Sequence, residues 1–171
     1  AINLIIINII LTYINVQNAN IELSFFIIGQ IVILLSFLLF NFPNAKIFLG
    51  DSGSYLFGSL TALNTIMTNN LNPNYSSFFF CILLFYIFFE VFFSFIRKVF
   101  QKKSPVQPDN NHLHMLGFKK ISLKFGRNKG NYINSVVINI VYFTLILPAL
   151  LFAKDPMISR YWFFFLIIIY L

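Results

Sequence analysis

Long apolar runs dominate this chain, and short polar segments separate them. A bilayer core needs about 20 apolar residues per helix, with a range of about 17–25. Six runs are candidates, and they cover residues 2–15, 23–42, 54–68, 77–97, 133–153 and 161–171. With 58% apolar and only 10% charged residues, an ordinary soluble domain of 171 residues is excluded. We therefore predict an all-α fold, a polytopic transmembrane helical bundle with about six membrane segments.

The two ends of the chain lie inside apolar runs. Ala1 opens the first run and Leu171 lies within the last, and because no positively charged segment precedes the first run, we do not expect it to be a signal peptide. We expect a fragment of a longer membrane protein with its first and last segments clipped. Residues 1–171 are predicted to form a single transmembrane domain, with cytoplasmic catalytic loops at 43–54 and 97–132.

Basic residues are concentrated between the fourth and fifth apolar runs. Nine of the twelve lie there, against one acid: Arg97, Lys98, Lys102, Lys103, Lys119, Lys120, Lys124, Arg127 and Lys129. The positive-inside rule makes this loop cytoplasmic and puts 43–53 on the same face, so polar groups of both loops can converge on one site. Orientation and anionic lipid explain most of these charges. Residues 112–125 suit a short amphipathic helix in the membrane interface, although Gly117 weakens that interpretation.

A polar, glycine-bearing turn lies within residues 41–59, NFPNAKIFLGDSGSYLFGS. Asp51 is the one carboxylate of this turn. Its presence between two apolar runs calls for an explanation, because an Asp at mid-bilayer costs about 2.5–3.5 kcal/mol. Two interpretations stay open. Asp51 caps the following helix, or it binds Mg²⁺, which takes one or two carboxylates together with substrate phosphates and waters. Gly50 and Gly53 allow the backbone to approach a phosphate, and the helix start offers it N–H groups.

Two histidines, His112 and His114, lie in the segment PDNNHLHMLGF of the basic loop. An extended segment would place both imidazoles on one side, whereas a helix would splay them. Imidazoles bind phosphate or metal and shuttle protons near neutral pH. The alternative is a pair of interfacial histidines in a wet loop. Zinc is disfavoured because no third ligand of the usual kind is nearby.

A third candidate, Glu90, lies within the fourth apolar run. An intramembrane carboxylate is a functional candidate by default, with a partner to be named. Arg97, seven residues later and on nearly the same helix face, and Lys46 are the nearest plausible partners. A structural ion pair and a catalytic role remain equally open.

Two motifs occur in order along the chain: the string NFPNAKIFLGDSGS with a helix expected after it, and a basic loop that contains SP and PDNNHLH. Together they resemble the polyprenyl-phosphate N-acetylhexosamine-1-phosphate transferases. The resemblance covers roughly residues 1–135, and the HxH form is closer to the undecaprenyl-phosphate N-acetylglucosamine-1-phosphate branch than to phospho-N-acetylmuramoyl-pentapeptide transferase. It implies transfer of a HexNAc-1-phosphate from a UDP-sugar to undecaprenyl phosphate with release of UMP, the first step of lipid-linked cell-envelope glycan synthesis, for instance of lipopolysaccharide.

The resemblance also implies partners and a location. The cofactor would be Mg²⁺, with Mn²⁺ as an alternative, and the partners would be UDP-N-acetylhexosamine, undecaprenyl phosphate and membrane lipid. A homodimer is left open, and nucleic acid is not expected. The protein would be a multi-pass protein of the bacterial inner membrane with its active site on the cytoplasmic face.

Residue by residue, the first motif carries over to residues 41–52. Asp51 matches the family's metal-binding aspartate and is the first catalytic candidate. Asn41 and Phe48 match positions that hold the uracil, by hydrogen bonding and stacking respectively. Lys46 is assigned to substrate binding, and Ser52 is a further candidate.

The second motif carries over to the basic loop. His112 and His114 match the loop histidines linked to the nucleotide-sugar phosphates, and Arg97 matches a basic position before that loop. Glu90 aligns where the family often has Asp, and Asp109 is a further candidate.

Two departures from the family pattern stand out. Met115 replaces a histidine that the family often has, and the family's paired aspartates should lie upstream of Ala1, so the fragment is expected to be inactive alone. The alternatives from other classes are a transporter or ion-binding module that uses Asp51 and Glu90, and a non-catalytic membrane scaffold.

Overall fold

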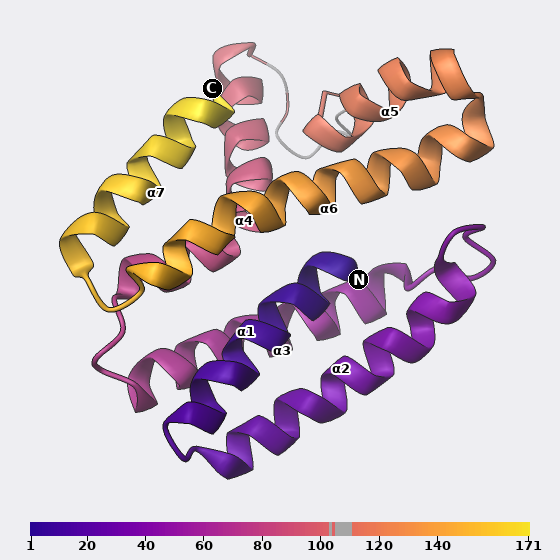
Figure 1. The fold of residues 1–171 in the computed structure, drawn as a ribbon. Coiled ribbons are helices and arrows are strands. Elements are labelled where there is room, and N and C mark those ends of the chain that lie inside the picture. Colours follow the sequence, from indigo (N-terminus) through magenta and orange to yellow (C-terminus); the bar gives the residue numbers. More distant parts are fainter. Residues whose placement is uncertain (103, 105–110) are drawn as a thin grey trace. The chain divides into compact units, whose positions relative to one another are not determined.

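The computed structural model describes residues 1–102, 104 and 111–171, and the chain is helical through most of them (Figure 1). The predicted all-α fold is confirmed for these residues, which contain no strand. The helices are α1 (Ile2–Gln17), α2 (Ile21–Asn41), α3 (Gly50–Leu71), α4 (Ser77–Phe100), α5 (Leu113–Phe125), α6 (Arg127–Leu151) and α7 (Pro156–Tyr170).

Within the described residues, three helices are long and apolar enough to cross a membrane. These are α2, α4 and α6, with 21, 24 and 25 residues. The apolar helices α1 and α7 are shorter, at 16 and 15 residues. Length and composition thus support three of the six predicted membrane segments outright. Helix α3 has 22 residues but falls outside this group, because it carries Thr61, Asn64, Thr65 and Thr68 on one face.

Several helix boundaries differ from the predicted ones. The polar turn predicted to reach residue 54 ends at Leu49, because α3 already begins at Gly50, which has a positive φ of 69°. The predicted loop at 97–132 contains α5, so the helix suggested for residues 112–125 is present despite Gly117. Pro148 lies inside α6, which continues to Leu151.

The chain divides into two compact units. One unit comprises residues 1–83 and 145–171, and the other comprises residues 84–144. In the first unit, α1 packs against α2 and α3 (Figure 1). Its apolar cluster of Ile5, Leu34 and Phe57 takes one residue from each of the three helices.

Buried polar side chains also join these three helices. Asn64 of α3 donates to Gln30 of α2 at 2.8 Å and to Asn8 of α1 at 3.2 Å, and all three residues are buried. One turn further along α3, Thr68 accepts from Asn15 of α1 at 2.7 Å. Interhelical hydrogen bonds of this kind hold membrane helices together, because an unpaired amide in an apolar interior is costly. We call these five side chains, Asn8, Asn15, Gln30, Asn64 and Thr68, the polar seam.

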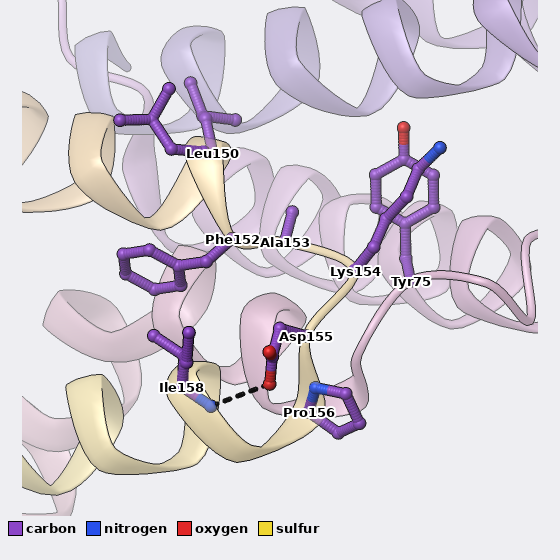
Figure 2. Close-up of a pocket in the computed structure, with 9 residues that line it drawn as sticks. Tyr75, Leu150, Phe152, Ala153, Lys154, Asp155, Pro156 and Ile158 are labelled. Carbon is purple, nitrogen blue, oxygen red and sulfur yellow. Dashed lines mark hydrogen bonds between the residues drawn. The ribbon is translucent and has the colours of Figure 1, made fainter.

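The connection between α6 and α7 packs on the connection between α3 and α4 in the same unit. The Ser76 N–H donates to the Ala153 carbonyl at 2.8 Å. Lys154 extends beside Tyr75, with its ammonium 5.3 Å from the ring centroid (Figure 2). Asp155 caps α7 by accepting from the backbone N–H groups of Met157 and Ile158. The hollow at this connection is lined by none of the predicted site residues.

The polar seam predicts a stability effect. Asn64→Ala would leave Gln30 and Asn8 without their shared partner inside the bundle, so we expect the free energy of unfolding to fall by about 1–2 kcal/mol. Thermal unfolding of the purified protein in detergent measures this loss. Asn70→Ala, at an exposed position of the same helix, is the matched control and should stay within about 0.5 kcal/mol of the parent. Equal effects of the two substitutions would contradict the seam's role.

Candidate functional site

The first group of predicted residues surrounds the start of α3 in the first unit. Asp51 is the second residue of α3 and is exposed, and Ser52 follows it in the same turn. The helix begins after Leu49 with no side-chain cap, so the interpretation of Asp51 as the capping residue is wrong. The free N–H groups of this first turn, and the positive end of the helix dipole, are a suitable environment for an anion.

The segment before α3 is anchored at both ends. Asn41 donates its Nδ2–H to the Ile47 carbonyl at 2.7 Å, which closes the connection between α2 and α3. Leu49 packs against the apolar cluster of the first unit and covers Gly53, where an added Cβ would lie 2.8 Å from the Leu49 Cγ. Between these anchors, Lys46 and Phe48 are exposed, with 82% of Phe48 accessible. The exposed Phe48 ring and Lys46 ammonium lie a few residues before Asp51 in the sequence and suit a nucleotide, whereas the Asn41 Nδ2 already donates within the chain.

Asp51 offers a single carboxylate to a metal. Among residues 1–102, 104 and 111–171, no three His, Cys, Asp or Glu side chains form a group that could hold a metal ion. An exposed carboxylate fits Mg²⁺ as one ligand of several, because Mg²⁺ is usually held by one or two carboxylates and completes its shell with phosphates and water.

The second group of predicted residues meets in the second unit, at the start of α5. One oxygen of Glu90, Oε1, accepts from the Leu113 backbone N–H at 2.7 Å. The same oxygen lies 3.1 Å from Nδ1 of His112 and 4.0 Å from Nδ1 of His114. Glu90 is buried, with 9% of its side chain exposed, so these contacts offset the cost of removing its carboxylate from water.

The two histidine rings are stacked, with centroids 5.5 Å apart and planes inclined by 15°. His112 is extended, at φ −67° and ψ 146°, and precedes α5, whereas His114 belongs to its first turn. Because only one of the two is helical, both imidazoles lie on one side. Burial lowers the pKa of His114, and the neighbouring His112 lowers it further, whereas Glu90 opposes the shift.

Helix α5 is held against α6 by two close approaches. Asn134 of α6 donates to the His114 carbonyl at 2.8 Å, and a Cβ added at Gly117 would overlap its Oδ1. Further along, a Cβ at Gly130 would lie 2.8 Å from the Cα of Ser122. Gly117 therefore permits contact between the helices. Asn134 was missed as a residue that positions the histidines, because a lone Asn in an apolar run carries no distinctive signal.

The remaining predicted residues are placed as follows. Arg97 lies near the end of α4, with its guanidinium 5.6 Å from the Phe93 ring centroid. Asp109 lies outside the described residues. Met115 donates its backbone N–H to the His112 carbonyl at 2.9 Å.

The structure thus brings Glu90, His112 and His114 together. The convergence of Asp51 with the histidines stays a prediction, since these residues belong to separate units.

Comparisons with known proteins support the family resemblance. Residues 1–69 match the model described as glycosyl transferase family 4. Over 100 residues, 58% of this chain and 31% of the relative, the chain is 37% identical to the undecaprenyl-phosphate alpha-N-acetylglucosaminyl 1-phosphate transferase of Thermotoga maritima. Over 81 residues, 47% of this chain and 23% of the relative, it is 35% identical to a probable undecaprenyl-phosphate N-acetylglucosaminyl 1-phosphate transferase of Bacillus subtilis.

The chain therefore spans less than a third of the length of these two curated relatives. No solved structure matches it significantly. The predicted resemblance to polyprenyl-phosphate sugar-1-phosphate transferases is confirmed over the matched part of the chain.

The contact between α5 and α6 predicts the effect of one added methyl group. Gly117→Ala should displace Asn134 and destabilise the protein by about 1–3 kcal/mol, as overpacking usually does. The unfolding temperature and protease cleavage between residues 111 and 130 would both report this. Gly58→Ala is the control, because nothing lies within 4 Å of its added Cβ, and it should be neutral or stabilising. A Gly117→Ala variant as stable as Gly58→Ala would contradict the packing.

The environment of His114 predicts its titration. Its pKa is lowered in the folded chain, so the unfolded chain binds more protons near pH 6, and the contribution of His114 to stability falls as the pH drops through about 6.5. NMR of protein with labelled histidines should show a midpoint for His114 below that of a solvated peptide. A midpoint above 6.5 would mean that the Glu90 charge outweighs burial.

Proposed function

We propose that the intact protein containing this chain transfers a HexNAc-1-phosphate from a UDP-sugar to undecaprenyl phosphate and releases UMP. The observation that carries the proposal is the 37% identity over 100 residues to a relative whose name states this acceptor and N-acetylglucosaminyl 1-phosphate. The location that follows is the bacterial inner membrane, with the active site on the cytoplasmic face. Lipopolysaccharide synthesis is one pathway that such a product would feed.

The chemistry of both polar segments supports this proposal. The reaction brings together a diphosphate dissolved in water and a phosphate carried by a lipid, so it needs positive groups at the membrane surface. The uncapped start of α3 offers N–H groups, and Lys46, four residues before the helix in the sequence, offers a cation. The stacked pair of His112 and His114 offers two imidazoles. Phosphoryl transfer depends mostly on positioning and electrostatics, which such groups supply.

Asp51 would hold Mg²⁺, with Mn²⁺ as an alternative. When bound, the metal offsets the repulsion between the two anionic substrates and stabilises charge on the leaving UMP. The exposed ring of Phe48 would stack on the uracil, and Lys46 would pair with a phosphate of the donor. Arg97, Ser52 and Asp109 remain further candidates for substrate contact.

The comparisons favour the transferase over a transporter or a passive scaffold, because both relatives are named as transferases.

The metal assignment predicts the effect of removing one charge. In the intact protein, Asp51→Asn should reduce Mg²⁺-dependent turnover at least about 100-fold, because a bound metal supplies several kcal/mol of transition-state stabilisation. Release of UMP from UDP-N-acetylglucosamine with undecaprenyl phosphate measures it. Asp155→Asn is the matched control, since Asn also caps a helix well, and it should retain activity. Normal UMP release by Asp51→Asn would refute the assignment.

A further inference from the structure

We infer that Glu90 is a positioning residue, which fixes the start of α5 and orients His112 through Nδ1 so that Nε2 is left for a phosphate group of the substrate. The inference rests on the proposed function only for the nature of that substrate. Its observations are the two hydrogen-bond distances at Glu90 Oε1, 2.7 Å to the Leu113 nitrogen and 3.1 Å to Nδ1 of His112.

Glu90 binds the backbone at the start of α5. Leu113 is the first helical residue of α5, and its N–H has no acceptor inside the helix. No side chain of α5 itself caps this end. The Glu90 carboxylate accepts from this N–H and places a negative charge at the positive end of the helix dipole. One oxygen therefore ties the start of α5 to a buried position of α4.

Glu90 also determines which nitrogen of the His112 imidazole carries the proton. An ionised carboxylate can only accept a hydrogen bond, so Nδ1 of His112 carries the proton in the contact at 3.1 Å. In neutral His112, Nε2 then holds a lone pair. In free histidine the Nε2–H tautomer predominates, so Glu90 selects the less common form. Carboxylates that bind one ring nitrogen in this way set which nitrogen faces the chemistry.

The other ring nitrogen of His112, Nε2, can bind a phosphate group. Nε2 of neutral His112 accepts a hydrogen bond from a phosphate hydroxyl, and Nε2 of the imidazolium donates one to a phosphate oxygen. With 24% of its side chain exposed, His112 is more buried than His114, at 50%. The more buried of the two rings is therefore the one that Glu90 contacts more closely.

The test that is independent of catalysis is the tautomer of His112. Nitrogen NMR of the intact protein, labelled at histidine and assigned with a His112→Asn variant, should show the Nδ1–H form. Glu90→Ala should shift His112 toward the Nε2–H form. Glu22→Ala, which removes an exposed carboxylate from the first turn of α2, should leave the spectrum unchanged. An Nε2–H form in the parent, or no response to Glu90→Ala, would overturn the inference.

The second test uses turnover. Glu90→Ala should lower kcat/KM about 10–100-fold, as removal of a group that orients a functional histidine does. Glu90→Gln, which keeps the shape and an acceptor for Leu113, should lose less. In a His112→Ala background, Glu90→Ala should cost less than about twofold, because the ring it orients is already absent. The same 10–100-fold loss in that background would show that Glu90 does not act through His112.

The two tests separate this inference from the proposed function. A protein that lacks transferase activity, but whose His112 tautomer responds to Glu90→Ala, keeps Glu90 as a positioning residue and refutes the proposed reaction. An active transferase with an Nε2–H tautomer in the parent keeps the reaction and refutes the positioning.

Discussion

The second unit depends on the pairing of the buried Glu90 carboxylate with the His112 ring and the Leu113 N–H. A negative charge buried in an apolar helix is stable only when partners replace the water it has lost. The chain supplies them from 22 and 23 residues away, as the His112 ring and the Leu113 N–H. Desolvation thus has a structural result, because the pairing of this carboxylate ties down the start of α5 at Leu113 and orients His112, the residue before it.

The start of α3 meets the same constraint differently. Asp51 is exposed, so water can solvate it, and its place in the first turn of a helix is electrostatically favourable. What the fold fixes here is the backbone, through the hydrogen bond from Asn41 to Ile47 and the packing of Leu49 on Gly53. The backbone before α3 is thus held in place while its polar groups stay in contact with water.

The helices could be predicted from the sequence because the thickness of a bilayer sets how many consecutive apolar residues a spanning helix needs. Boundaries were less predictable where glycine has two meanings. Gly50 suggests a turn but begins a helix, and Gly117 weakens a helix prediction but permits contact with α6. The grouping of His112 with His114 followed from their spacing. The pairing with Glu90 and the support from Asn134 did not, because both depend on contacts between helices that no local pattern encodes.

The composition of α3 has a consequence for how the chain enters a membrane. Buried Thr61, Asn64, Thr65 and Thr68 give this helix a face that hydrocarbon would not accept on its own. Asn8, Asn15 and Gln30 are made earlier during synthesis and can meet that face as it emerges. We therefore expect membrane insertion of this region to be cooperative, with α3 inserting together with the hairpin of α1 and α2.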